Sequence, residues 1–97
     1  MTEKSIRQQV VGHLKAVPGL WFTSVVGTPY GQRGVPDILG CYKGFFFGME
    51  IKKPGGKLTP LQQHAAKLIM EAGGVWACVS SAKEAREEIK LWEDENA

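Results

Sequence analysis

The sequence has few cysteines and no long apolar run. Its only cysteines, Cys41 and Cys78, lie in separate apolar segments and form no C-x-x-C pair, so neither a zinc site nor a disulfide is expected. No apolar stretch approaches the ~20 residues of a membrane span, and the polar residues 1–5 are not those of a signal peptide. Repeats, linkers and low-complexity tracts are also missing. We therefore expect one soluble, cytoplasmic domain over residues 1–97, with both cysteines reduced and buried.

The net charge of +2 conceals an uneven distribution. Residues 1–67 hold nine Lys or Arg against three Asp or Glu, a net charge of +6, whereas residues 68–97 hold three against seven, a net charge of −4. A basic region suits a phosphate-rich partner, because cationic side chains displace the counterions of nucleic acid. The alternative for Lys4, Arg7 and Lys15 is that they only solvate one face of a helix.

Apolar spacing, capping residues and turn residues predict seven elements in the order α-β-β-β-α-β-α. They are a helix from Thr2 or Ser5 to about Val17, strands over residues 21–26, 35–42 and 45–52, a helix from Thr59 to about Ala72, a strand over residues 75–79, and a helix from Ser81 to about Glu93. A hairpin meander joined to a further strand through a helix gives an α/β fold with a mixed four-stranded sheet flanked by helices. In the second helix, we expect burial of Leu61, Ala65, Leu68, Ile69 and Ala72.

Acidic and basic side chains meet at the end of the third predicted strand. Glu50 and Lys52 flank Ile51 there, and side chains two residues apart on a strand point to the same face. Asp37 lies on the neighbouring predicted strand, across the tight turn at residues 43–44, so both carboxylates can hold a divalent cation beside an ammonium group. A second Glu-x-Lys, at residues 88–90, falls in a predicted helix, where residues two apart do not face each other.

The motifs Gly34-Val35-Pro36-Asp37 and Glu50-Ile51-Lys52, in this order of elements, resemble the PD-(D/E)xK nuclease superfamily. The sequence is most similar to its VRR-NUC branch, in particular to the small stand-alone members of the phage type. The resemblance covers essentially the whole chain and implies a restriction-endonuclease-like αβββαβ(α) core. The residues that match the site of the branch are Glu3, Asp37, Glu50, Lys52 and Gln62.

The resemblance also implies a function and a ligand set. A Mg²⁺ or Mn²⁺ ion would be bound by Asp37, Glu50, the main-chain carbonyl of Ile51, and Glu3 directly or through water. Lys52 would position the attacking water and stabilise the transition state. The implied activity is a DNA endonuclease that hydrolyses phosphodiester bonds in Holliday junctions or other branched DNA, in replication, recombination or repair. Because cutting both strands of a junction needs two sites, we expect a homodimer.

Further residues are candidates for DNA contact. Tyr30, Gln32 and Arg33 lie in a glycine-rich loop before the Pro-Asp pair, and Lys53 and Lys57 follow the catalytic lysine. The alternative is that these loop residues are simply exposed and contact no DNA. We interpret the two histidines as ordinary helix residues. The three tryptophans are interpreted as residues of the core or of a subunit interface. The residues in question are His13, His64, Trp21, Trp76 and Trp92.

Several site residues have a purely structural alternative. Asp37, Glu50 and Lys52 would form an ordinary surface salt bridge. Gln62 would only complete the capping box of Thr59, and Glu3 would only complement a helix dipole. The alternative for the whole protein is a catalytically silent DNA-binding module with the same fold. No small-molecule organic cofactor is expected.

Overall fold

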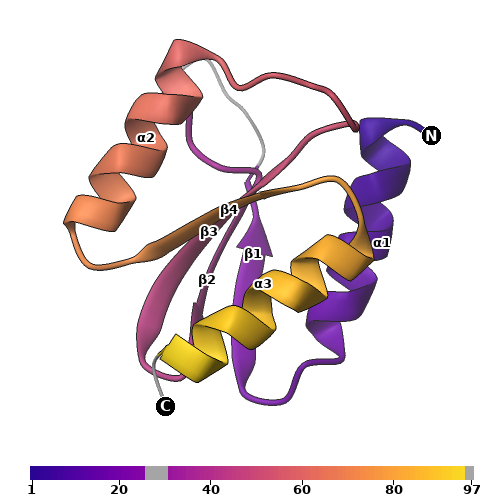
Figure 1. Cartoon of the computed structure of the whole chain (residues 1–97), viewed down its shortest axis with the longest axis vertical. Coiled ribbons are helices and arrows are strands. Elements are labelled where there is room, and N and C mark those ends of the chain that lie inside the picture. The colour runs from indigo at the N-terminus through magenta and orange to yellow at the C-terminus, as the bar shows by residue number, and fades with distance from the viewer. Residues whose placement is uncertain (26–30, 96–97) are drawn as a thin grey trace.

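The computed structural model describes residues 1–25 and 31–95 of the chain (Figure 1). The elements follow the predicted order, which confirms the α/β class with a mixed four-stranded sheet flanked by helices. Their bounds are α1 Glu3–Lys15, β1 Leu20–Ser24, β2 Ile38–Tyr42, β3 Phe45–Ile51, α2 Pro60–Glu71, β4 Val75–Val79 and α3 Ala82–Glu95. No helix in the described residues is long and apolar enough to cross a membrane.

The sheet has the strand order β1-β2-β3-β4. The first three strands form an antiparallel meander, and β4 runs parallel to β3 after the crossover through α2. The register pairs Ile38 with Met49 and Glu50 with Cys78. Glu50 therefore lies on an interior strand of the sheet, with β2 on one side and β4 on the other.

Two site residues lie just outside the strands predicted to carry them. Asp37 immediately precedes β2, and Lys52 immediately follows β3. The ladder between β2 and β3 ends at Ile38 and Met49, because Pro36 has no backbone N–H to extend it, and the side chain of Asp37 accepts the N–H of Ile51 instead. This carboxylate replaces a ladder carbonyl, which explains why the strand begins later than predicted.

One face of the sheet packs against α1 and α3. Phe47, Met49 and Ile51 alternate along β3 toward this face, and all three are buried. The same core contains Ile6, Val10 and Leu14 from α1 and Ala85, Ile89 and Trp92 from α3. The indole of Trp92 lies 5.3 Å from the ring of Phe47, centroid to centroid. Figure 1 shows α3 crossing the front of the sheet with α1 beside it.

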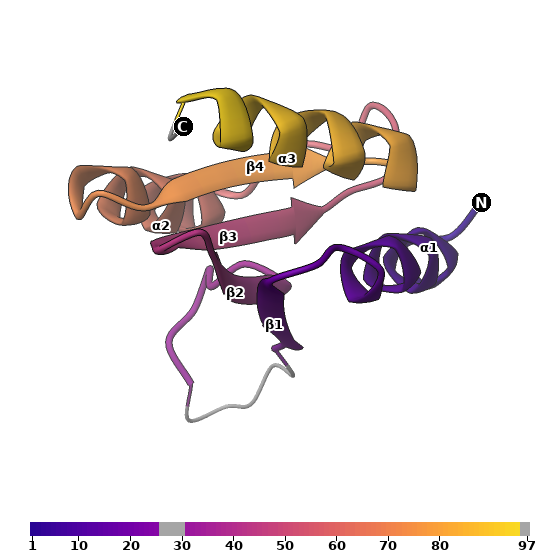
Figure 2. The same ribbon diagram turned by 90° about the horizontal axis from the view of Figure 1, so that it is seen from below.

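The opposite face is only partly covered. Gly48 lies on this opposite face of β3, next to Ile69 of α2. Helix α2 contacts β3 and β4 (Figure 2). No helix of the described residues covers the outer half of this face, over β1 and β2. Trp21 and Phe46 are exposed there. Cys41 is exposed as well, and Cys78 is half-buried; both are free thiols.

The predicted burial of α2 was therefore partly wrong. Ala65 is buried and Ile69 half-buried, but Leu61, Leu68 and Ala72 are exposed. The apolar face of the helix is only partly buried, because the helix lies over β3 and β4 and not over all four strands. The predicted burial was wrong for Cys41, which is exposed on β2, where no helix of the described residues covers this face. It was partly right for Cys78, which is half-buried on β4.

Trp92 and Trp21 form a matched pair for a test of the core. Trp92 is 3% exposed and Trp21 is 66% exposed. We expect Trp92→Ala to lower the free energy of unfolding by about 3–5 kcal/mol, because it leaves a cavity beside Phe47, and Trp21→Ala by less than about 1 kcal/mol. Urea denaturation followed by circular dichroism measures both. Equal losses in the two variants would contradict the assigned core.

Candidate active site

Close packing of the Gly34-Val35-Pro36-Asp37 segment positions the first carboxylate. Gly34 has φ +81°, and a Cβ atom there would lie 2.3 Å from the carbonyl oxygen of Leu61, so only glycine fits. Pro36 is fully buried over Gly48, where an added Cβ would lie 2.9 Å from the proline Cγ. These two contacts hold the segment against the start of α2 and against β3, and Asp37 follows directly.

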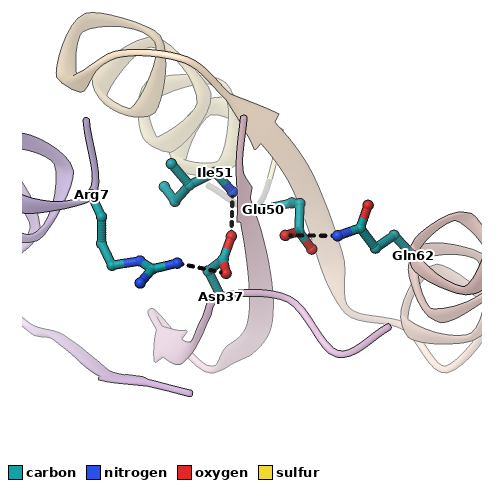
Figure 3. Close-up of polar contacts among 5 residues, drawn as sticks. All are labelled: Arg7, Asp37, Glu50, Ile51 and Gln62. Atoms are coloured by element: carbon teal, nitrogen blue, oxygen red, sulfur yellow. Dashed lines mark hydrogen bonds and ion pairs between the residues drawn. The ribbon is translucent and has the colours of Figure 1, made fainter. Parts of the chain in front are cut away.

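Both carboxylate oxygens of Asp37 have hydrogen-bond donors (Figure 3). The backbone N–H of Ile51 donates to Oδ2 at 2.8 Å, and Nη2 of Arg7 donates to Oδ1 at 2.9 Å. These bonds come from different elements, β3 and α1, so they fix the plane of the carboxylate between two parts of the fold. The bond from Ile51 also ties Asp37 to the residue next to Glu50.

Arg7 is the site residue that the sequence reasoning missed. It was interpreted as one of three basic residues that either bind nucleic acid or solvate a helix face. Arg7 lies four residues after Glu3, and residues four apart share a face of a helix. Since Glu3 was already a site candidate, this spacing was the signal that placed Arg7 on the same side.

The carboxyl group of Glu50 is buried. The residue is 3% exposed, and Nε2 of Gln62 donates to its Oε1 at 3.3 Å (Figure 3). Its Oε2 is buried and meets no hydrogen-bond donor among the described residues. A buried carboxylate oxygen without a donor is costly unless a proton or a cation meets it.

Gln62 contacts both the cap of α2 and the carboxyl group of Glu50. Its Oε1 accepts the backbone N–H of Thr59 at 2.9 Å, and its backbone N–H donates to the Thr59 hydroxyl at 3.2 Å, which completes the capping box of α2. Because the amide oxygen faces the cap, the amide NH₂ faces Glu50. The capping box thus orients the group that holds the buried carboxyl.

The environment of Glu50 raises its pKa to about 8. Burial is the largest cause, since it penalises the charged form, and the neighbouring Asp37 carboxylate is the next. Lys52 acts in the opposite direction, and Glu3 adds a smaller increase. Two nearby acidic groups with one raised pKa form the electrostatic pattern of a cation or catalytic site.

Lys52 lies beside this acidic pair without an ion pair to it. Its backbone N–H donates to the carbonyl of Val79 at 3.1 Å, which fixes the base of the side chain at the end of β3. Over residues 1–25 and 31–95, the ion pairs are Arg7 with Asp37 and Lys67 with Glu71. The simple surface salt bridge considered for Asp37, Glu50 and Lys52 is therefore not formed.

Glu3 is the first residue of α1, and Thr2 caps this helix by accepting the N–H of Ser5. The charge of Glu3 reaches Glu50, as its effect on the pKa shows. In the described part of the chain, however, no three acidic, histidine or cysteine side chains form a metal-binding group. Glu3 is a neighbour of the Asp37–Glu50 pair rather than its third member.

The candidate DNA-contacting residues surround the acidic pair in sequence. Gln32, Arg33, Lys53 and Lys57 are all exposed, as phosphate contacts require. Tyr30 lies outside the described residues. The second Glu-x-Lys, residues 88–90, lies within α3, so it does not reproduce the strand arrangement of Glu50 and Lys52.

The donors present fit a small divalent cation. Asp37 and Glu50 are close enough for one to raise the pKa of the other, and the main chain of Ile51 lies against Asp37. Carboxylate and carbonyl oxygens are the ligands that Mg²⁺ and Mn²⁺ prefer. The buried Oε2 of Glu50 meets no donor within residues 1–25 and 31–95, and a cation bound there would supply the missing positive charge.

A comparison with solved structures identifies the fold. The chain is similar to a VRR_NUC domain with a TM-score of 0.75 and 21% sequence identity, over 91% of this chain and 94% of that chain. No protein-family model and no curated protein matches the sequence. The chain therefore has the restriction-endonuclease-like fold of a VRR_NUC domain, and the resemblance drawn from its motifs is confirmed at the level of the fold.

The raised pKa of Glu50 predicts a pH-dependent stability. Its ordinary value is 4.5 and its value in the folded protein is about 8. Between these values the unfolded chain loses the proton that the folded protein retains, so the free energy of unfolding falls as the pH rises toward 8. Above pH 8, we expect the free energy of unfolding of Glu50→Gln to be a few kcal/mol higher than that of the wild type. The reason is that each unit of pKa shift corresponds to about 1.4 kcal/mol.

Urea denaturation from pH 4.5 to pH 9 in the presence of EDTA measures this difference. The exposed Glu87→Gln in α3 removes the same charge away from the site and serves as the matched control. A Glu50→Gln variant that loses stability with pH as steeply as the wild type would contradict the assignment.

Proposed function

We propose that this protein is a metal-dependent DNA endonuclease, with Mg²⁺ or Mn²⁺ bound by Asp37 and Glu50. The observation that carries the proposal is the acidic pair on the VRR_NUC fold. The two carboxyl groups come from different segments, are oriented by Ile51 and Gln62, and lie beside Lys52, which has no ion pair among the described residues. A buried acid without a cation opposes folding. A protein that used these residues only for a salt bridge would therefore not be expected to bury Glu50 beside Asp37.

The proposed ligands are Asp37, Glu50 and the main-chain carbonyl of Ile51, with Glu3 acting through water. Water is assigned between Glu3 and the ion because Glu3 does not form a three-residue metal-binding group with Asp37 and Glu50 among the described residues. The ion, when bound, lowers the pKa of water and takes up charge on the phosphoryl oxygens. The protein supplies rigid oxygen donors at one end of β3.

Lys52 is proposed to position the attacking water and to stabilise the negative charge that develops on the phosphoryl group. Its backbone is fixed by Val79, and its ammonium group has no ion-pair partner among the described residues that would have to be displaced. Gln62 keeps Glu50 in place. Arg33, Lys53 and Lys57 are proposed to bind phosphates, and Gln32 and Tyr30 to contact the DNA nearby.

Cleavage assays test the proposed function. Purified protein is incubated with labelled four-way, flap and linear DNA in Mg²⁺, Mn²⁺ or EDTA. We expect metal-dependent cleavage with a preference for branched DNA, and loss of at least about 100-fold in Asp37→Asn and Glu50→Gln, because each loses a charged ligand. Lys52→Ala is expected to lose turnover, by a factor of about 100 or more, and to retain Mn²⁺ binding in calorimetry.

Absence of cleavage of all three DNAs in either metal would favour the silent DNA-binding module. Normal cleavage by Asp37→Asn would refute the ligand assignment. The exposed Lys90→Ala in α3 is the control for loss of one lysine, because it lies in the second Glu-x-Lys segment and is expected to cleave like the wild type.

We also propose that the protein acts as a homodimer, since one chain carries one acidic pair and a junction must be cut in two strands. The apolar side chains left uncovered by α2 support this proposal. Phe46 and Leu68 are exposed at 43% and 42%, and with Val35, Leu39 and Ile69 they line a hollow on the protein surface. Exposed apolar surface of this kind is typical of subunit interfaces.

A charge introduced into this surface tests the dimer. We expect Leu68→Glu to convert the protein to a monomer, because the carboxylate would be buried without a partner in the interface. Leu91→Glu in α3, where Leu91 is 53% exposed, is the matched control and should remain dimeric. Sedimentation velocity measures both. A monomeric wild type at micromolar concentration would contradict the proposal.

A further inference from the structure

We propose that Arg7 is a positioning residue that occupies Asp37 until a divalent ion displaces it, and that the displaced guanidinium then binds a DNA phosphate. The inference rests on the proposed function of the Asp37–Glu50 pair. It adds a coupling between metal binding and DNA binding through a residue of α1.

The geometry shows Arg7 in direct contact with a proposed ligand. Its Nη2 lies 2.9 Å from Oδ1 of Asp37, while Oδ2 is held independently by the N–H of Ile51. Removal of Arg7 therefore leaves one of the two bonds that orient this carboxylate. Asp37 is held in place without Arg7, so the arginine is not required merely to build the site.

The guanidinium of Arg7 is incompletely satisfied. Its Nε is buried and has no acceptor among the described residues, yet the side chain as a whole is 43% exposed. A half-exposed arginine with an unused donor can leave its partner without unfolding the helix that carries it. An arginine that served only to stabilise the fold would be expected to use its buried donor.

Charge makes Arg7 and a divalent ion competitors. Each is attracted to the same carboxylate, and two cations that share one carboxylate repel each other at a separation of a few ångströms. Lys52, the other cation near the pair, has no ion pair to either acid within the described residues. Arg7 is thus the cation in place at Asp37 when no metal is bound.

Displacement gives the guanidinium a new partner. A DNA strand at the acidic pair carries phosphate oxygens, and the planar fork of arginine binds them through two parallel N–H donors. Arg7 would use its Nε there, the donor that Asp37 leaves without a partner. Metal binding would therefore increase DNA affinity beyond the direct attraction of the ion.

The first arm of the test measures metal affinity without DNA. Calorimetric titration with Mn²⁺ compares the wild type, Arg7→Ala and Lys15→Ala, which removes the same charge from an exposed position in the last turn of α1. We expect Arg7→Ala to bind Mn²⁺ about tenfold more tightly, a typical coupling between competing sites, and Lys15→Ala to match the wild type. Should Arg7→Ala fail to fold, Arg7→Gln removes the charge while retaining a polar side chain that is too short to reach Asp37 as arginine does, and its expected change has the same sign.

The second arm measures DNA affinity with and without metal. Fluorescence anisotropy with a labelled four-way junction, in Mn²⁺ and in EDTA, is performed in a Lys52→Ala background to prevent cleavage. We expect the gain in affinity on adding Mn²⁺ to be several-fold smaller with Arg7→Ala, and unchanged with Lys15→Ala. A role of Arg7 in fold stability alone would leave this gain unaltered.

Unchanged or weaker Mn²⁺ binding by Arg7→Ala would overturn the inference, and so would an unchanged gain in DNA affinity. Failure of the proposed function looks different. In that case the wild type binds no Mn²⁺, or Asp37→Asn binds it equally well, or the wild type cleaves no DNA. A wild type that binds Mn²⁺ through Asp37 and cleaves DNA isolates the role of Arg7.

Discussion

The burial of the Glu50 carboxyl is the constraint on which the other features of the site depend. Burial on an interior strand disfavours the ionised form of Glu50, and the nearby Asp37 carboxylate disfavours it further. The pKa of Glu50 therefore rises to about 8. Gln62 donates a hydrogen bond to one oxygen of the group, and the other oxygen meets no donor among the described residues. The protein thus keeps an acid where folding alone would favour an apolar residue, as functional sites commonly do.

The surrounding structure offsets this cost through rigid neighbours. Two close contacts, of Gly34 with α2 and of Pro36 with Gly48, place Asp37 just before the start of β2. The capping box of α2 orients Gln62 toward Glu50, so an ordinary element of helix stability also serves the site. Both acids are therefore held by bonds that belong to the fold, whereas Arg7 is the more exposed member of its ion pair with Asp37.

Local sequence patterns predicted much of the fold and the core of the site. The order of elements, the capping box at Thr59 and the bounds of β4 all follow from short-range spacing, and Asp37, Glu50 and Gln62 were named from motifs and are brought together. The exposure of Leu61 and Leu68 was not predictable, because periodicity shows that a helix face is apolar and not what covers it. The contact of Arg7 with Asp37 joins residues 30 apart in sequence, a distance that no local pattern encodes.

The VRR_NUC fold and the acidic pair lead to one central claim, that Asp37 and Glu50 bind a divalent ion together. The most direct measurement is a crystal structure of the protein soaked with Mn²⁺, with anomalous diffraction used to locate the ion. We expect an ion with oxygen atoms of both Asp37 and Glu50 among its ligands, at distances of about 2.0–2.3 Å. Full occupancy elsewhere on the protein, with no ion between these two carboxyl groups, would contradict it.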